Sequence, residues 1–386
     1  MTAKDDKKEG VAIDPLKSAV NSLRKGKYRE SFGGVNPTGA SAWMINEKGE
    51  KTLVGKCLRQ VWYSKKKVPR TNTASDDNHF IFMMGNAGEG GLQQAWEKGG
   101  ILLEANSKMV HNLAKDPEKD EEIRLSGEVD AIVRWSEYRE DDNGEERVFI
   151  DPTKAIGIEV KTKYGHFGKA QIMGNRDSVY ENGFPQIEHL MQTGLYLAAR
   201  KRYEKFHNVE IPYFTICYVL RDNGVHKSFR VELSDGYDGR IIVKDMDGNE
   251  LEPRAELALD WGMKPQKIEL TIDMMRERYY EQIENLKSDE PPAREYDLRY
   301  SDEKAERLFD AGLMSKTKKA KHEKDPLGDI GDWNCSYCDW KDACYPQGIF
   351  TVDVENGILT VDEALEKYGI GVGHGWVKGE DNVLDS

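Results

Sequence analysis

The chain contains 386 residues, of which 38% are hydrophobic and 32% are charged, and its formal net charge is −13. No apolar run approaches the roughly 20 residues of a membrane-spanning helix, and the N-terminal residues lack the apolar core of a secretion signal. These features argue against a membrane or secreted protein and favour a soluble, cytoplasmic one. The acidic charge argues against indiscriminate nucleic-acid binding, but it is compatible with a local basic channel.

Composition divides the chain into three parts. Residues 1–38 are polar and charged with little periodicity, which predicts a mobile leader with one short helix at 15–24. Residues 39–350 contain the periodic apolar segments of a single α/β domain. Residues 351–386 are rich in glycine and acidic side chains, and they predict a C-terminal extension with a helix at 361–368.

Apolar periodicity predicts both helices and strands in the central part. Residues 41–67 are interpreted as an amphipathic helix with Leu58, Val61 and Trp62 on its buried side. Residues 185–203 form the clearest predicted helix, and a further one follows at 272–286. Strands are expected at 101–110, 123–135, 155–163, 211–220 and 225–233, the last two joined by the hairpin signal Asp222-Asn223-Gly224.

Polar segments separate these elements. Residues 115–122 and 245–252 predict turns, and residues 138–147 predict an acidic loop that delays the following strand. Residues 164–183 are interpreted as a surface loop, with a substrate-contacting loop as the alternative. Residues 288–332 predict a polar linker, whose five lysines between positions 315 and 325 form either a solvated run or a phosphate-contacting patch.

Two neighbouring predicted strands carry an unusual set of ionisable side chains. Asp130 is flanked by apolar residues, where a solvated acid is not expected. Glu159 and Lys161 are separated only by Val160, so they point to the same face of their strand. If the two strands pair, two carboxylates and an ammonium group converge, and carboxylate oxygens suit Mg²⁺ or Mn²⁺. The alternative is an ordinary strand with a solvated charged face.

The segment GEVD, which ends at Asp130, and the segment EVK, which begins at Glu159, resemble the core signature of the PD-(D/E)XK nucleases. The resemblance implies an α/β fold with a mixed sheet flanked by helices. It also implies that Asp130, Glu159 and the Val160 carbonyl hold Mg²⁺ or Mn²⁺. Lys161 would then orient the attacking water or stabilise the transition state of phosphodiester hydrolysis.

Two further motifs resemble the RecB-like branch of these nucleases. A helix before the aspartate strand carries a glycine followed four residues later by a histidine or acid near the metal, and Gly85 and Glu89 occupy those places. The branch usually has histidine there, so Glu89 is either a metal ligand or a solvated glutamate. Gln192 and Tyr196 match the QxxxY motif that follows E-x-K, which implies that they line the active site and contact DNA.

Four of the five cysteines suggest a second metal site. Cys335, Cys338 and Cys344 have C-x2-C-x5-C spacing, which is typical of zinc or iron-sulfur ligation and leaves one ligand missing. Cys57 lies far upstream, and one cysteine before the core with three after it resembles the iron-sulfur nucleases related to AddB and the CRISPR-associated adaptation exonuclease. That resemblance implies a 4Fe-4S cluster that joins the two ends of the domain, with zinc as the alternative. Cys217 is expected in a strand outside this set.

These features together predict a metal-dependent DNA exonuclease that acts in recombination, repair or replication. The expected partners are DNA with a free end or a single strand, and a protein of a replication or recombination complex. A catalytically silent DNA-binding or scaffold subunit is the alternative, because the net charge is acidic and Glu89 replaces the common histidine.

Overall fold

The structure is a computed structural model in which residues 35–349 and Glu363 are described, apart from short gaps. The gaps are 46–50, 73–75, 114–122, 141–142, 164–165, 175–182, 235–238, 252–253, 256–265, 268, 312–313, 347 and 350–362. The predicted helix at 15–24 lies outside the described residues, as does all of the predicted helix at 361–368 except Glu363.

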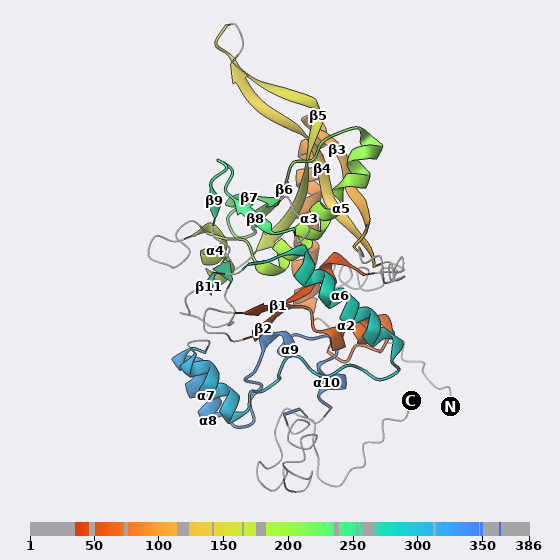
Figure 1. Cartoon of the computed structure of the whole chain (residues 1–386). Helices are drawn as coiled ribbons and strands as arrows, with labels where there is room; N and C mark the ends of the chain where they lie inside the picture. The colour runs from red at the N-terminus through yellow and green to blue at the C-terminus, as the bar shows by residue number, and fades with distance from the viewer. Residues whose placement is uncertain are drawn as a thin grey trace, which may run out of the picture.

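A mixed seven-stranded sheet forms the centre of the fold, and its strands follow one another in the order β3-β4-β5-β6-β7-β8-β9 (Figure 1). All neighbouring strands are antiparallel except β5 and β6, which run parallel. The strands are β3 (Leu102–Asn112), β4 (Arg124–Glu140), β5 (Glu146–Lys163), β6 (Phe214–Leu220), β7 (His226–Leu233), β8 (Ile241–Lys244) and β9 (Glu250–Leu251). The α/β class predicted from the sequence is therefore confirmed.

Helices cover both faces of this sheet. Successive residues of β4 point to opposite faces, and Ala131 packs with Leu92 and Trp96 of α3 (Asp76–Lys98). Ile132 packs instead with Leu197 of α5 (Ile187–His207). Helices α3 and α5 therefore lie on opposite sides of β4, which places the two helices that bear predicted site residues on either side of the sheet.

Segments from the two ends of the described chain pack together beside the sheet (Figure 1). The N-terminal part consists of the β1–β2 hairpin and α2, and it packs on α6. The indole of Trp340 is buried with Trp62 and Tyr63 of α2, and its Nε1 donates to the Val68 carbonyl at 2.9 Å. The bounds are β1 (Ser41–Ile45), β2 (Lys51–Gly55), α2 (Leu58–Lys65), α6 (Ile272–Lys287), α9 (Trp333–Ser336) and α10 (Lys341–Cys344).

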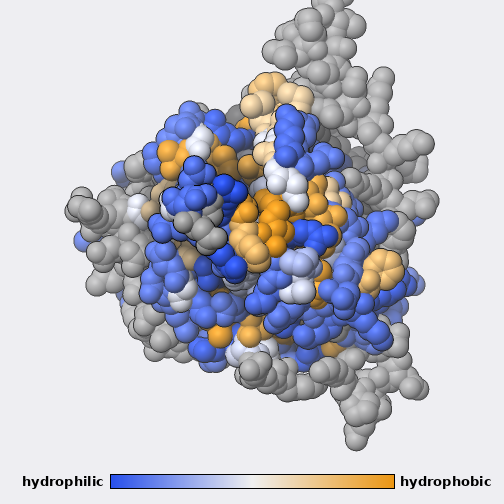
Figure 2. Space-filling model, turned by 90° about the horizontal axis from the view of Figure 1, so that it is seen from above, coloured by the Kyte–Doolittle hydropathy of each residue, from blue (hydrophilic) through white to orange (hydrophobic). Residues whose placement is uncertain are grey.

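The hairpin of β4 and β5 extends beyond the other strands as a two-stranded arm (Figure 1). Tyr138, Val148 and Phe149 are exposed on it. Seen from this end of the molecule, the surface is mostly hydrophilic, with a group of hydrophobic side chains near its middle (Figure 2). Because β4 continues to Glu140 and β5 starts at Glu146, the acidic loop predicted at 138–147 is wrong except for a short turn.

Three other sequence predictions are corrected. The single helix predicted for 41–67 is helical only at Leu58–Lys65, and the β1–β2 hairpin precedes it. The surface loop predicted for 164–183 contains α4 (His166–Met173), and the linker predicted for 288–332 contains α7 (Asp302–Asp310) and α8 (Lys316–Lys324). Two lysines of α8 contact neighbouring groups, since Lys318 lies over the Tyr300 ring and Lys319 pairs with Glu306. The other three, Lys316, Lys321 and Lys324, are exposed, as the predicted solvated run requires.

Other predicted elements are confirmed. The helices predicted at 185–203 and 272–286 correspond to α5 and α6. The Asp222-Asn223-Gly224 segment joins β6 to β7 as an antiparallel pair. Two further short strands, β10 (Arg254–Ala255) and β11 (Gln266–Lys267), pair with each other and form a separate two-stranded sheet. No helix in the described ranges is long and apolar enough to span a bilayer.

Gly157 is expected to be essential for the contact between β5 and β6. A Cβ atom at this position would lie 2.5 Å from the buried Phe214 ring, so Gly157→Val should lower the free energy of unfolding by about 1–3 kcal/mol through overpacking. Gly90→Ala in α3 is the control, because nothing lies within 4 Å of its Cβ, and it should raise stability by about 1 kcal/mol. Urea unfolding measures both; equal stability of wild type and Gly157→Val would contradict this packing.

Candidate active site

Asp130 and Glu159 lie where the main-chain pairing of β4 with β5 ends. The last paired residues are Ala131 and Ile158. Just beyond them, the backbone N–H of Val160 donates to Oδ2 of Asp130 at 2.6 Å. A side-chain carboxylate therefore takes the place of a main-chain acceptor, and it fixes Asp130 beside the segment that carries Glu159.

Glu159 is buried, with a relative exposure of 1%. Nζ of Lys161 donates to its Oε1 at 2.5 Å, so the two side chains lie on one side of β5 as their spacing predicts. Within the described ranges, the buried Oε2 of Glu159 has no hydrogen-bond partner. A buried carboxylate oxygen without a partner is costly, and it marks the point where a further positive group would be stabilised.

Electrostatic coupling links three carboxyl groups. Burial raises the pKa of Glu159 to about 8, Lys161 opposes this increase, and the charges of Asp130 and Glu89 add to it. Burial also raises the pKa of Asp130, against the opposing effect of Lys161. The pKa of Glu89 rises through burial and then through the charge of Asp130. The sequence left open whether Glu89 is a metal ligand or a solvated glutamate. In the structure its carboxyl group interacts electrostatically with those of Asp130 and Glu159.

Helix α3 approaches β5 through glycines, and this close approach brings Glu89 to the site. A Cβ at Gly85 would lie 3.2 Å from Oγ1 of Thr162, and one at Gly88 would lie 3.4 Å from its methyl group. Gln93, one turn after Glu89, donates from Nε2 to Oε1 of Glu89 at 3.1 Å and to the Asp130 carbonyl at 2.8 Å. Gln93 therefore ties the helix to the aspartate strand.

Gln192 and Tyr196 lie beneath the aspartate strand. The Tyr196 hydroxyl donates to the Glu128 carbonyl at 2.9 Å and accepts from Nε2 of Gln192 at 3.3 Å. Burial raises the pKa of Tyr196, and the nearby charge of Glu159 raises it further. Tyr196 is 2% exposed and Gln192 is 8% exposed. The described contacts of both side chains are inside the protein, so these side chains support the segment before Asp130 and lie back from the surface.

The donors at this site fit a hard divalent cation. Three carboxylates in a poorly solvated setting repel one another, and Mg²⁺ or Mn²⁺ prefers oxygen ligands and retains several waters. Among the described residues, however, no group of three or more His, Cys, Asp or Glu side chains is placed so that it could hold a metal ion. The unpartnered Oε2 of Glu159 is the observation that supports a fit, while the Val160 carbonyl as a ligand stays a prediction.

The four cysteines that were grouped from the sequence line one small cavity of about 30 Å³. Cys57 is the residue before α2, whereas Cys335, Cys338 and Cys344 come from α9, α10 and the segment between them. Cys217 lies elsewhere, in β6, where its sulfur accepts from Oγ of Ser228 at 3.4 Å. Sulfur donors on one cavity fit a thiophilic metal or cluster.

Long-range hydrogen bonds hold this cavity together. Oε2 of Glu295 accepts from the backbone N–H of Leu58 at 2.6 Å, and its Oε1 accepts from the buried Arg278 at 2.7 Å. Nδ2 of Asn72 donates to the Cys338 carbonyl at 3.0 Å, and Nε of Arg294 donates to the Cys344 carbonyl at 3.0 Å. Burial raises the pKa of the Cys57 thiol to about 11.

Sequence reasoning missed Gln93 and Glu295. Gln93 is detectable in principle, because it lies four positions after Glu89 on a predicted helix and so faces the same side. Glu295 has no local signal, since its partners Leu58 and Arg278 are far away in the sequence.

The buried carboxyl of Glu159 should make stability fall with increasing pH in the metal-free protein. Its pKa is about 8 in the folded chain and 4.5 in the reference state, so between these values the folded state holds a proton that the unfolded state has lost. Glu159→Gln removes this dependence and should be more stable than wild type by about 1 kcal/mol or more at pH 8.5, with a smaller difference at pH 5. Urea unfolding in EDTA at both pH values measures this.

The exposed Glu137→Gln, also in β4–β5, is the matched control and should show little change at either pH. A stability difference between wild type and Glu159→Gln that is independent of pH would show that the carboxyl is not desolvated in the folded chain.

Comparisons with known proteins identify no family for this chain. No protein-family model matches the sequence, and no curated protein matches it. A solved structure described as "Crystal structure of SSO0001" is similar at 18% sequence identity and a TM-score of 0.31. The match covers 55% of this chain and 74% of that chain.

Proposed function

We propose that this chain is a Mg²⁺- or Mn²⁺-dependent DNA exonuclease with a PD-(D/E)XK fold of the RecB-like iron-sulfur group. The single observation that carries the proposal is the buried, unpartnered Oε2 of Glu159 beside Asp130 and Lys161 at the end of the β4–β5 pairing. A buried carboxylate oxygen without a partner, close to two other carboxyl groups, is a place where a divalent cation would be stabilised.

Asp130, Glu159 and Glu89 would hold the divalent ion, with the Val160 carbonyl as a further oxygen. A bound Mg²⁺ or Mn²⁺ supplies a more acidic water and neutralises charge on the phosphate. The ammonium group of Lys161 donates hydrogen bonds either to the attacking water or to a non-bridging phosphate oxygen. The water oxygen would bond to phosphorus and lose a proton to solvent, while the phosphorus–oxygen ester bond breaks and the departing oxygen takes up a proton from solvent.

Gln192 and Tyr196 position Asp130 in this proposal, through a hydrogen bond to the backbone two residues before it. The Tyr196 hydroxyl holds the Glu128 carbonyl two residues before Asp130, and Gln192 orients that hydroxyl. These contacts fix the position of Asp130 relative to Glu159. A catalytic carboxylate must be held within a fraction of an ångström of its productive position, which accounts for a buried polar pair at this point.

Cys57, Cys335, Cys338 and Cys344 would bind a 4Fe-4S cluster, with zinc as the alternative. The support is that four sulfur-bearing side chains line one cavity while the fifth cysteine lies in the sheet. Such a group would link the residue before α2 to the C-terminal helices α9 and α10. The cluster has a structural role in this proposal, because the carboxylates lie on other elements, namely α3, β4 and β5.

The second candidate is a catalytically silent DNA-binding or scaffold subunit of a replication or recombination complex. The acidic net charge of −13 favours it, since a nuclease that binds DNA broadly is usually basic. The presence of all the carboxylates together with Lys161 favours the enzyme. Recombination, repair and replication are the processes in which a DNA exonuclease of this kind would act.

Lys161→Ala should abolish DNA cleavage while leaving the fold intact. Loss of an electrostatic donor to the transition state typically costs about 100- to 1000-fold in rate. Wild type and variant are compared on end-labelled single- and double-stranded DNA with Mg²⁺, Mn²⁺ or EDTA. Lys154→Ala is the matched control, because Lys154 also lies in β5 but contacts the Trp135 ring, and it should cleave like wild type. Wild-type protein without metal-dependent cleavage would favour the scaffold.

Anaerobically purified protein should be brown, with the visible absorption of iron bound by thiolates and with iron and sulfide in stoichiometric amounts. Cys335→Ser should lose this absorption, and its thermal stability should fall because α2 and α10 are no longer linked. Cys217→Ser is the matched control and should keep the colour, since Cys217 lies in β6. Colourless protein with stoichiometric zinc would overturn the assignment of iron and support the alternative metal.

A further inference from the structure

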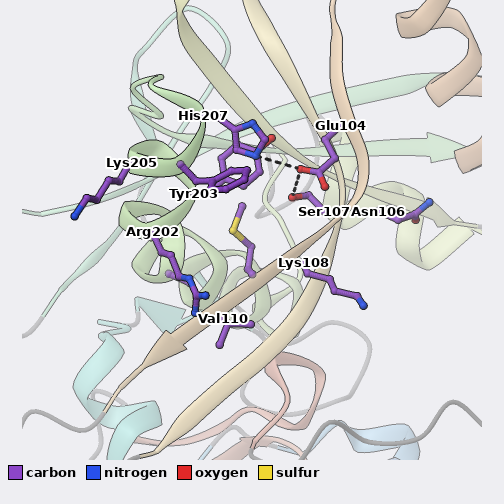
Figure 3. Close-up of a pocket in the computed structure, with 12 residues that line it drawn as sticks. Glu104, Asn106, Ser107, Lys108, Val110, Arg202, Tyr203, Lys205 and His207 are labelled. Carbon is purple, nitrogen blue, oxygen red and sulfur yellow. Dashed lines mark hydrogen bonds and ion pairs between the residues drawn. The ribbon is translucent and has the colours of Figure 1, made fainter.

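A cavity of about 780 Å³ lies between β3 and the C-terminal half of α5 (Figure 3). None of Glu89, Asp130 and Glu159 is among the residues that line it. Its lining from β3 includes Glu104, Ser107 and Lys108, and its lining from α5 includes Arg202 and His207. The volume lies within the usual range for ligand sites. Strand β3 stands at one end of the strand order of the sheet, so the cavity follows a sheet edge.

The charge of this cavity differs from that of the whole chain. Lys108, Arg202 and Lys205 are exposed cations in the lining, against the single carboxylate of Glu104, whereas the chain carries a net charge of −13. In Figure 3, Lys205 extends outward from α5 and Lys108 extends outward from β3, so these two cations lie on the outer flanks of the cavity. Global charge and local field are separate quantities, and cations around a concave surface attract an anionic ligand.

The one carboxylate of the lining, Glu104, has a side chain that is 41% exposed and that contacts two neighbouring side chains. Oε2 of Glu104 accepts from Oγ of Ser107 at 2.9 Å, and it lies 3.8 Å from Nε2 of His207 (Figure 3). Ser107 is itself buried, with a relative exposure of 1%. The carboxylate of Glu104 thus contacts Ser107 of β3 and His207 of α5. Its single negative charge offsets only part of the positive charge of the three cations in the lining.

Aromatic rings form a second feature of the cavity. The rings of Tyr203 and His207 are stacked, with centroids 4.0 Å apart and an interplanar angle of 24°. Phe206 contacts the His207 ring edge-on, with centroids 4.8 Å apart, and is 83% exposed. A phenylalanine that keeps most of its surface in water gains by stacking on another flat group. The cavity therefore combines cations with an available aromatic face.

The cavity lies beside the candidate active site, because it shares α5 with that site and its other element, β3, pairs with the aspartate strand β4. Ser107 pairs with Val129, the residue before Asp130, across β3 and β4. Tyr203 follows Tyr196 by seven positions on α5, so the two tyrosines lie on one side of that helix, about two turns apart. The cavity therefore lies next to the elements that support Asp130.

We propose that this cavity is a binding groove for single-stranded DNA outside the catalytic centre. Lys108, Arg202 and Lys205 contact the phosphates, and a base stacks on Phe206. The choice of DNA rests on the proposed nuclease function, while the chemistry rests on the groove itself: cations along a channel with stacking rings are the features that bind single strands without sequence preference.

Two other ligands fit the groove less well. An acidic peptide would satisfy the cations but offers Phe206 no flat π-face. In double-stranded DNA the bases are stacked on one another, so an exposed ring at a groove edge does not reach a base face. Single-stranded DNA uses both the cations and the ring.

Binding of the full chain to a fluorescein-labelled oligothymidylate, measured by fluorescence anisotropy in EDTA, tests this proposal. Phe206→Ala should weaken binding about fivefold or more, and Phe206→Trp should restore it. The double variant Arg202→Ala/Lys205→Ala should bind less tightly, and the slope of log affinity against log salt should become shallower by about 1.4, which corresponds to two lost phosphate contacts. The exposed Lys201→Ala, on the same helix but paired with Glu204, is the matched control and should bind like wild type.

The proposal is overturned if wild type does not bind the oligonucleotide, or if Phe206→Ala and the double variant bind as wild type does. It is also overturned if polyglutamate of equal charge competes as well as unlabelled oligothymidylate, because that result identifies an acidic polymer site. Cleavage assays separate this test from that of the enzyme: Lys161→Ala should retain binding, and the groove variants should raise KM with kcat within about twofold. Absence of cleavage by wild type, together with ring-dependent binding, would support the groove and contradict the nuclease.

Discussion

The backbone N–H of Val160 is held by a carboxylate instead of a neighbouring strand, and the candidate site is arranged around that hydrogen bond. An amide without an acceptor near the protein interior is costly, so Asp130 is fixed where the amide lies. The same contact places Asp130 beside the segment of β5 that continues into the parallel pairing with β6. The pairing with β4 ends at Ile158 while the pairing with β6 on the other edge of β5 continues, and this leaves an opening in which the ionisable side chains meet.

The position of Glu159 gives this opening its chemistry. Folding buries the carboxylate against a single cation, Lys161, and leaves one oxygen without a described partner. A buried ion pair can often be replaced by apolar residues of similar size with no loss of stability. Stability of the fold therefore does not explain why Glu159 is buried beside Lys161. A site for a divalent cation does explain it, because the ion would reduce the repulsion among Glu89, Asp130 and Glu159. The glycines of α3 contribute by letting the helix that carries Glu89 lie close to Thr162.

Strand alternation was sufficient to predict that Asp130, Glu159 and Lys161 converge, because a period of two and a strand pairing fix which side chains meet. Helices α5 and α6 were predicted because their apolar residues recur with the period of a helix. The β1–β2 hairpin was missed because its strands are only five residues long and precede a helical pattern. Helices α7 and α8 were missed because tertiary contacts stabilise them: Arg299 donates to the His322 carbonyl, and Lys319 pairs with Glu306. The position of Glu295 depends on the whole fold, and local sequence carries no sign of it.

Helix α5 connects the two regions on which the proposals rest. Its N-terminal half is buried and supports the strand before Asp130 through Tyr196, whereas its C-terminal half carries exposed cations and Phe206. The burial difference follows from the packing of α5. Its first turns lie within the main core, whereas its last turns contribute only Ala199 and Tyr203 to the smaller one. A single helix therefore contributes to both regions: it supports the strand before Asp130 with one half and lines the proposed groove with the other.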